Sequence, residues 1–239
     1  MTDAIIAELA PAGTLRAALN LSNFLLVSGK SATGEATGVA PDLARMIAER
    51  LGVPIRFVTY ERPRALADDA GTGVWDIGFI GAEPARAETI AFSAAYTEIE
   101  ATYLLPAGSP LTSMADIDQS GVRIAVSGGS AYDLWLTRNI RRATLVRAAS
   151  PDASFHQFVD EQLDALAGLR PRLLTDIEQL PGARILDARF TAVQQAIGTA
   201  RSNMAGAAFL EAFVADAKRD GWIAEAIERH GVRGLSVAG

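Results

Sequence analysis

The sequence contains no cysteine, which excludes disulfides, thiolate metal sites and cysteine nucleophiles. Its two histidines, His156 and His230, lie far apart and have no second histidine or acid at metal-ligand spacing, so we expect no metal site. No serine lies in a GxSxG elbow, and no segment has the GxxxxGK[ST] pattern of a nucleotide-binding loop. We therefore expect neither a cofactor nor a serine hydrolase.

Long hydrophobic runs and an excess of positive charge are also missing. No apolar run approaches the roughly 18 residues of a membrane span. The net charge of −6 leaves no broad basic surface for nucleic acid, although a local group remains at Arg138, Arg141, Arg142 and Arg147. Nucleic acid is thus not an expected partner.

The composition is that of a soluble globular protein, with 49% hydrophobic and 21% charged residues among 239. This length permits one large domain or two smaller ones. The first residues carry acids at Asp3 and Glu8 and no basic segment before an apolar core, so they do not form a secretory signal peptide. Either a signal was removed or the protein never had one.

Strand and helix patterns alternate along the first part of the chain. Residues 14–19 predict a strand that runs into a polar turn, residues 38–53 an amphipathic helix, and residues 54–60 a strand. A short helix follows, and then a strand over 76–81. Such alternation favours a mostly parallel sheet covered by helices.

A second set of alternating elements begins after Tyr96. We expect strands over 100–106, 122–129 and 143–149, helices over 130–140 and 151–162, and a strand or buried segment over 163–169. Further strands are expected over 183–190 and 193–200. Two consecutive helices are predicted over 205–231. The fold class is therefore α/β, with no linker that marks a domain boundary.

Two turns are candidates for binding an anion. Arg86 follows the strand over 76–81 in "GFIGAEPARAETIAFS", where it is either a solvated surface charge or a carboxylate-binding cation. The turn "VSGGSAYDLWL" places Gly129 and Ser130 between a strand and a helix. The N-terminus of a helix can hold a carboxylate, but Ser130 can equally be the N-cap of this helix.

In order along the chain, several segments resemble the family 3 solute-binding proteins of bacterial ABC transporters, which include polar amino-acid binding proteins. The resemblance covers about residues 13–231. Its central piece is the strand, turn, arginine and "IAFSAAY" sequence, with Ala95 where proline is usual. The other pieces are "GTLRAAL", "GVAPDLARMIAERLGV", "VRIAVSGGSAY", "LDALAGL" and "FVADAKRDGWIAEAIERHG".

The resemblance implies the type II periplasmic-binding fold, with two α/β lobes that close around a ligand. Residues 1–100 and 196–239 would form the first lobe, and residues 101–195 the second. Arg86 would hold the ligand's carboxylate, with help from the backbone N–H of Gly81 and from Gly129 and Ser130.

Departures from the family pattern concern the ligand's amine. The acid that usually accepts the ammonium is replaced by Leu169, and the small or hydroxylated residue before the turn is Phe79. We therefore expect a carboxylate ligand without the standard α-ammonium, or one whose amine is held elsewhere. Neutral hydrogen bonds would come from Asn20, Asn23 and Tyr60, with Phe24 adjacent and Arg170 as a holder of a second anionic group.

The function that the resemblance implies is a solute receptor, not an enzyme. It would bind a small carboxylate, amino acid-like or an organic acid, deliver it to an ABC permease in the membrane, and act as a monomer in the periplasm. Substitution of Arg86 by alanine should abolish binding with nearly unchanged melting temperature. The alternatives are an enzyme on the same fold, similar to cyclohexadienyl dehydratase, or a non-exported ligand-sensing module in the cytoplasm.

Overall fold

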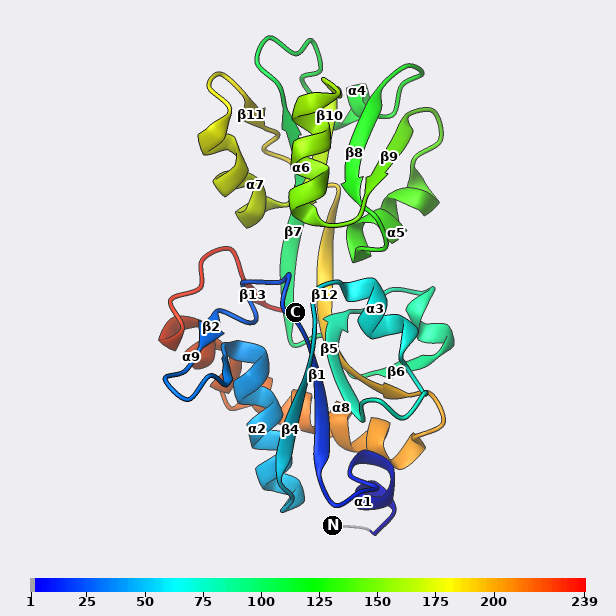
Figure 1. The fold of residues 1–239 in the computed structure, drawn as a ribbon, viewed down its shortest axis with the longest axis vertical. Helices are drawn as coiled ribbons and strands as arrows, with labels where there is room; N and C mark the ends of the chain where they lie inside the picture. Colours follow the sequence, from blue (N-terminus) through cyan, green and yellow to red (C-terminus); the bar gives the residue numbers. More distant parts are fainter. Residues whose placement is uncertain (1–2) are drawn as a thin grey trace. The chain divides into compact units, whose positions relative to one another are not determined.

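A computed structural model describes residues 3–239, which divide into two compact units (Figure 1). Unit 1 comprises the chain up to Glu98 together with Gln194–Gly239, and unit 2 comprises Ile99–Val193. Figure 1 colours unit 1 from blue to cyan at one end of the chain and orange to red at the other. Within residues 3–239, no helix is long and apolar enough to cross a membrane.

The sheet of unit 1 contains parallel strands in the order β4, β1, β5, followed by β12, which is antiparallel to β5. The strands of this sheet are β1 (Leu15–Asn20), β4 (Ile55–Tyr60), β5 (Ile77–Gly81), β6 (Ile90–Phe92) and β12 (Thr191–Ala200). A two-stranded hairpin pairs β2 (Gly29–Lys30) with β3 (Ala36–Thr37). Strand β13 (Ser236–Val237) pairs with the first residues of β7 (Thr97–Leu105).

The helices of unit 1 are α1 (Asp3–Leu9), α2 (Val39–Leu51), α3 (Pro63–Asp68), the 3₁₀ turn η1 (Arg86–Glu88), α8 (Met204–Arg219) and α9 (Trp222–Arg229). Helices α2 and α3 both contact β1, which explains why most residues of this strand are buried. Ala18 of β1 packs with Leu66, Trp75, Ile80 and Ile90 in one hydrophobic cluster.

The sheet of unit 2 has the strand order β7, β10, β8, β9, in which β8 is parallel to both β9 and β10. Its elements are α4 (Met114–Ile117), β8 (Arg123–Ser127), α5 (Ala131–Asn139), β9 (Thr144–Ala148), α6 (Pro151–Asp160), β10 (Ala165–Leu169), α7 (Arg170–Asp176), η2 (Ile177–Gln179) and β11 (Arg184–Ile185). One hydrophobic cluster includes Leu136 of α5, and another includes Phe155 of α6 and Leu173 of α7. Unit 2 is therefore a sheet with helices packed on it.

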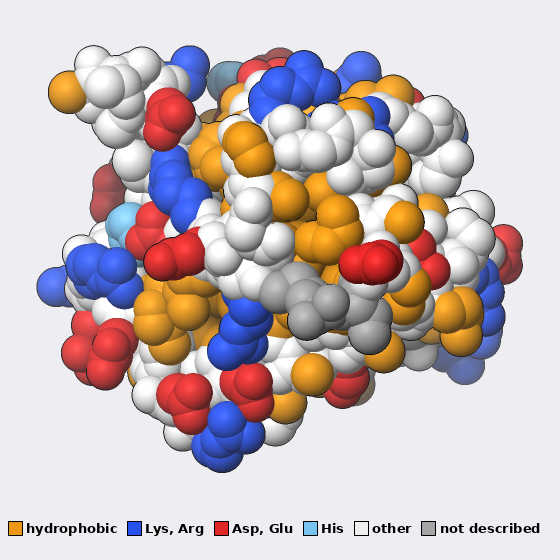
Figure 2. All heavy atoms as spheres, turned by 90° about the horizontal axis from the view of Figure 1, so that it is seen from below, with side chains coloured by type: hydrophobic (Ala, Val, Ile, Leu, Met, Phe, Trp, Pro, Cys, Tyr) orange, Lys and Arg blue, Asp and Glu red, His pale blue; other side chains and the backbone are white. Residues whose placement is uncertain are grey.

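Seen from below, side chains of both charge signs are interspersed with hydrophobic ones over the face drawn in Figure 2. Oppositely charged side chains on the surface also form ion pairs, such as the one between Arg50 and Asp216 at 3.3 Å. Exposed pairs of this kind add little stability individually.

Candidate functional site

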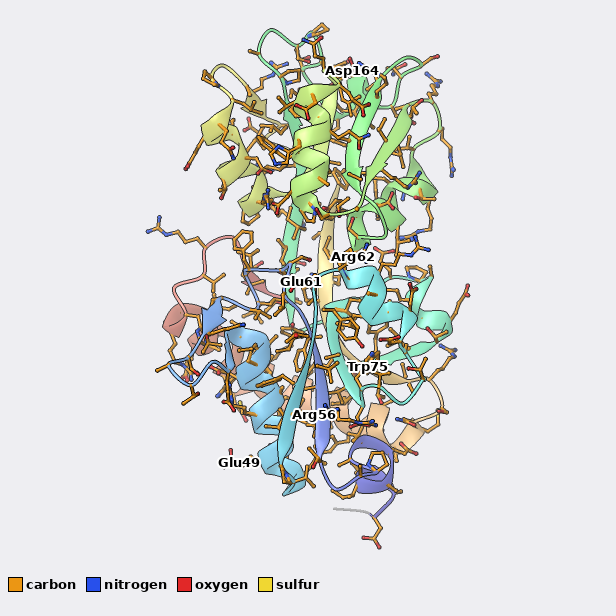
Figure 3. All side chains as sticks on the ribbon, viewed as in Figure 1. Glu49, Arg56, Glu61, Arg62, Trp75 and Asp164 are labelled. Carbon is orange, nitrogen blue, oxygen red and sulfur yellow. The ribbon has the colours of Figure 1, made fainter. Side chains whose placement is uncertain are left out.

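Three parallel strands of unit 1 end at the same edge of their sheet. Asn20 of β1 lies opposite Tyr60 of β4, and Leu19 lies opposite Phe79 of β5. The segments that follow these strands therefore emerge side by side, and Figure 3 labels Glu61 and Arg62 where the chain leaves β4. In open α/β sheets, ligands bind beyond the carboxyl ends of the strands. Six of the predicted residues lie at the ends of these strands or in the segments that follow them, namely Asn20, Asn23, Phe24, Tyr60, Gly81 and Arg86.

Arg86 is a buried cation with a fixed position. Its side chain is only 5% exposed, so a solvated surface charge is the wrong interpretation. The guanidinium Nη1 donates to the carbonyl of Gly81 at 2.6 Å. Burial lowers the pKa of Arg86 to about 10, and the negative charges of Glu83 and Asp68 partly oppose this shift. A buried guanidinium held in this way can make strong charge-assisted bonds to an anion.

The peptide of Gly81 faces away from β12. Gly81 pairs with Gln195, and the next residue, Ala82, donates its N–H to the carbonyl of Gln194 at 2.7 Å. In an antiparallel pair, hydrogen-bonded and non-hydrogen-bonded positions alternate, so the N–H and C=O of Gly81 point away from this partner strand. The carbonyl accepts from Arg86. The N–H, which we expect to bind a ligand carboxylate, points to the side of the sheet where β1 lies.

The loop after β1 contains two asparagines that differ in their side-chain hydrogen bonds. The Oδ1 atom of Asn20 accepts from the N–H of Ser22 at 3.2 Å and from its Oγ at 2.7 Å, which closes an Asx turn. Asn23 is 8% exposed, and its Oδ1 is buried without a hydrogen-bond partner. The ring of Phe24 is 44% exposed. Asn20 therefore shapes the loop, while Asn23 and Phe24 remain candidates for ligand contact.

Tyr60 and Phe79 are both committed to other contacts. The hydroxyl of Tyr60 donates to Asp69 at 2.7 Å, and its pKa is raised by burial and by this carboxylate. Phe79 is 2% exposed, and its ring packs edge-on against Tyr96 with 6.0 Å between ring centroids. Phe79 thus packs in the core of unit 1, and its contact with a ligand stays a prediction.

In unit 2 the glycine turn is occupied by an internal carboxylate. The Oγ of Ser130 accepts from the N–H of Asp133 at 3.1 Å, so Ser130 is the N-cap of α5. The N–H of Gly129 donates to Asp133 Oδ2 at 2.8 Å, and Arg147 Nε donates to Asp133 Oδ1 at 2.9 Å. Asp133 is 3% exposed. Gly129 thus gives its N–H to Asp133, and the use of this turn for a ligand carboxylate stays a prediction.

The end of β10 places Leu169 and Arg170 at the start of α7. Leu169 is half-buried and packs against one of the hydrophobic clusters of unit 2. Arg170 Nε donates to Glu100 Oε2 at 2.8 Å, and its Nη2 donates to the carbonyl of Asp187 at 2.6 Å. Glu100 thus already pairs with this guanidinium, and a role of Arg170 as a holder of a second anionic group stays a prediction.

Sequence reasoning missed two acids beside the predicted residues. Glu83 precedes Arg86 by three residues, and Asp133 follows Ser130 by three. A spacing of three within a helical turn brings side chains to one side, so the pattern itself could have indicated both. Of the two histidines, His230 contacts Asp42 at 2.8 Å through Nε2. Residues 3–239 contain no group of three or more His, Cys, Asp or Glu side chains that could hold a metal ion.

The fold and the carboxyl-edge arginine define a class of ligand-binding protein, and comparison with known proteins gives the family. Residues 24–232 match the bacterial extracellular solute-binding proteins, family 3, and the chain belongs to this family. The resemblance inferred from the sequence is thereby confirmed. A search of curated proteins finds no match.

Solved structures of similar fold cover nearly the whole chain. A mutant of ArgBP from T. maritima has a TM-score of 0.77 at 20% identity and covers 96% of this chain and 100% of its own. A solute receptor for L-cysteine of Neisseria gonorrhoeae has a TM-score of 0.77 at 21% identity, with 96% and 95% covered. The ancestral amino acid-binding protein AncCDT-1, a precursor of cyclohexadienyl dehydratase, has a TM-score of 0.75 at 21% identity, with 94% and 98% covered. The predicted α/β fold of type II periplasmic binding proteins is confirmed.

Proposed function

We propose that this protein is the solute receptor of an ABC-type transporter and binds a small carboxylate, either amino acid-like or an organic acid. The observation that carries the proposal is Arg86, a buried guanidinium clamped on the carbonyl of Gly81 at the carboxyl edge of unit 1. One protein of similar fold is described as bound to L-arginine and another as a solute receptor for L-cysteine, which supports a ligand with a carboxylate. The part that unit 2 takes in ligand binding enters from the family resemblance.

The energetic reason lies in the desolvation of Arg86. Burial disfavours its charged form, as the lowered pKa shows, so the negative charge of an arriving carboxylate would stabilise a cation that has lost most of its water. The planar guanidinium suits the two oxygens of a carboxylate, and charge-assisted bonds of this kind are about twice as strong as neutral ones. A neutral ligand would gain much less.

Membership in the family supports the proposed partner and location. An extracellular or periplasmic receptor hands its solute to a membrane permease, and we assign both the permease partner and the periplasmic location on that basis. A monomer suffices for this role. The alternative of a ligand-sensing module in the cytoplasm would use the same carboxyl-edge site.

An enzyme on the same fold is the second candidate, because AncCDT-1 is described as a precursor of cyclohexadienyl dehydratase. Such chemistry needs a positioned general acid or base. Glu83 lies close enough to Arg86 to act on its charge, so this residue is a candidate general acid. Incubation with prephenate or arogenate tests this directly. Release of product would show that the protein is an enzyme and would contradict the proposed receptor function.

Calorimetric titration with a panel of amino acids and deaminated acids tests the proposed function. Substitution of Arg86 by alanine or lysine should weaken binding by roughly 10- to 100-fold or more, since hydrogen bonds to charged groups contribute about 1.5–3 kcal/mol each. Arg62→Ala is the matched control, because Arg62 is an exposed arginine where the chain leaves β4 (Figure 3). Retained binding in both Arg86 variants would overturn the proposal.

The alanine variant will also lose stability, contrary to the expectation of a nearly unchanged melting temperature. Arg86→Ala removes the donor of a buried bond and leaves the carbonyl of Gly81 without this partner. Such a loss costs about 1–3 kcal/mol. The lysine variant keeps the charge and a long side chain, so it separates loss of the guanidinium from loss of the fold.

A further inference from the structure

The chain passes between unit 1 and unit 2 inside two strands. The division falls between Glu98 and Ile99 in β7 and between Val193 and Gln194 in β12. The family resemblance implies that two lobes close by hinge bending, which a few backbone positions absorb. The contacts that hold the unit 1 end of β7 therefore decide where this strand can bend.

Two side chains of α8 hold the residues just before β7. Glu211 accepts a hydrogen bond from the backbone N–H of Ala94, and Lys218 Nζ donates to the carbonyl of Ala95 at 3.5 Å. The two side chains are seven residues apart in the helix and thus lie on one face of it. An anion meets the donor of this segment and a cation meets its acceptor. Hydrogen bonds to charged groups are about twice as strong as neutral ones.

Strand β13 and the two residues after it hold the same segment from another side. Strand β13 pairs with the first two residues of β7 (Figure 1). The N–H of Ala238 donates to the carbonyl of Tyr96 at 3.3 Å, and both residues are buried. Lys218 Nζ also donates to the carbonyl of Gly239 at 2.9 Å. One ammonium group thus joins this segment to the residues just before β7.

Strand β12 cannot provide the same support. It does contact this segment, because Tyr96 donates its N–H to the carbonyl of Gln195 at 2.9 Å. However, β12 itself continues into unit 2, so it bends together with β7. Helix α8 and strand β13 lie entirely within unit 1. They are therefore the elements that can hold the start of β7 fixed against unit 1.

We infer that Glu211 and Lys218 are positioning residues for hinge bending: together with β13 they anchor the unit 1 end of β7 and confine the bend to residues beyond Glu98. This inference rests on the proposed function, because it concerns the closure of a receptor around its solute. An anchored strand restricts the range of lobe arrangements in the free protein. Ligand binding then has less conformational freedom to remove.

The absence of cysteine allows a direct test, because two introduced cysteines can be spin-labelled without background. Arg56→Cys and Asp160→Cys place one label on an exposed residue of each unit. Pulsed electron paramagnetic resonance on the ligand-free protein then gives the distribution of distances between the labels. Lys218→Gln and Glu211→Gln, each added to this pair, should broaden the distribution.

Matched controls come from the same helix. Asp216→Asn removes an acid of α8 that pairs with Arg50 and Arg219, and Arg219→Gln removes an exposed cation next to Lys218. Neither control residue has a side-chain bond to the residues just before β7, so both variants should keep the parent distribution. Lys218→Arg retains the charge and should also stay close to the parent.

Hydrogen exchange gives a second readout. The amide of Ala238, which bonds to Tyr96 and not to Lys218, should exchange roughly tenfold or more faster in Lys218→Gln, on the scale of one lost hydrogen bond to a charged group. A merely structural contact would lower the melting temperature and speed this exchange without widening the distance distribution.

Two results would overturn the inference: an unchanged distribution in both Lys218→Gln and Glu211→Gln, or equal broadening in the two controls. Because the measurement uses ligand-free protein, it stands apart from the test of the proposed function. Failure of the proposed function would instead appear as retained binding in the Arg86 variants.

Discussion

At the scale of single residues, the buried guanidinium of Arg86 should make the proposed ligand binding depend on pH at the alkaline end. Burial holds the pKa of Arg86 at about 10, well below the usual value for arginine. The charged form exists below this pKa and is lost as the pH rises through it. A carboxylate ligand needs the charged form, so its affinity should be constant up to about pH 9 and then fall.

The measurement is a titration series from pH 8 to 11 with a deaminated acid, whose carboxylate stays ionised over this range. At pH 11, one unit above the pKa, about one tenth of Arg86 is charged, so the affinity should be roughly tenfold lower than at pH 8. Circular dichroism at each pH confirms that the fold persists. Affinity that stays level to pH 11 would contradict the assigned pKa of Arg86.

Single residues also explain why the site could be predicted only in part. The position of Arg86 after a buried strand indicated a special cation, and its burial agrees with that prediction. The partners of Gly129 and Arg170 depend on Asp133 and Glu100, of which Glu100 is 70 residues away in the sequence. No local pattern encodes such a long-range pair, so a donor that looked available in the sequence is engaged in the fold.

At the scale of elements, strong periodicity predicted the structure well. The helix expected over 38–53 is α2, and the strand expected over 76–81 is β5. The strand expected over 183–190 is shorter in the structure, where β11 comprises Arg184 and Ile185, although the N–H groups of Leu186 and Phe190 also donate to β7 carbonyls. Helix α7, which begins directly after β10, was not predicted, since Pro171 near its start reads as a break although proline is tolerated in the first turn.

The pairing of β12 with β6 depends on a glycine. Gly198 lies opposite Phe92, and a Cβ atom at this position would overlap the side chain of Ile90 and lie 3.2 Å from the ring of Phe92. Gly198→Ala should therefore destabilise the protein by about 1–3 kcal/mol, the usual cost of overpacking. Thermal unfolding should show a lower melting temperature, by roughly 3–10 °C for a chain of this size.

Gly29→Ala is the control for this substitution. Gly29 lies in the exposed hairpin strand β2, where a Cβ atom meets only Thr37 Oγ1 at an ordinary 3.6 Å. Its melting temperature should stay within about 2 °C of wild type, because surface substitutions usually change the free energy of unfolding by no more than about 0.5 kcal/mol. Equal behaviour of the two variants would show that the strand β6 yields to the added methyl group.

At the scale of the whole molecule, the order of segments along the chain predicted the family, and the match over residues 24–232 confirms it. Composition and the absence of cysteine served only to exclude other classes. Two lobes are expected, one over 1–100 with 196–239 and the other over 101–195. That they move as separate bodies stays a prediction. In the proposed function, ligand identity depends on a few side chains at one sheet edge, which is why family membership alone does not give it.

A ligand that binds the folded protein must also stabilise it. At a free concentration of 100 times Kd, one site adds about 2.7 kcal/mol to the free energy of unfolding. For a chain of this size, that corresponds to a rise in melting temperature of roughly 5–10 °C. A thermal-shift screen over amino acids and deaminated acids should therefore identify the ligand class before any calorimetry.

The same screen on Arg86→Lys distinguishes specific binding from a general effect of the solute. A compound bound through Arg86 should raise the melting temperature of wild type and of Arg62→Ala, but not that of Arg86→Lys. Excluded solutes stabilise all three proteins alike, because they act on the exposed surface rather than on one site. A compound that shifts all three equally is therefore not the ligand, and a panel with only such compounds would argue against a small carboxylate as the solute.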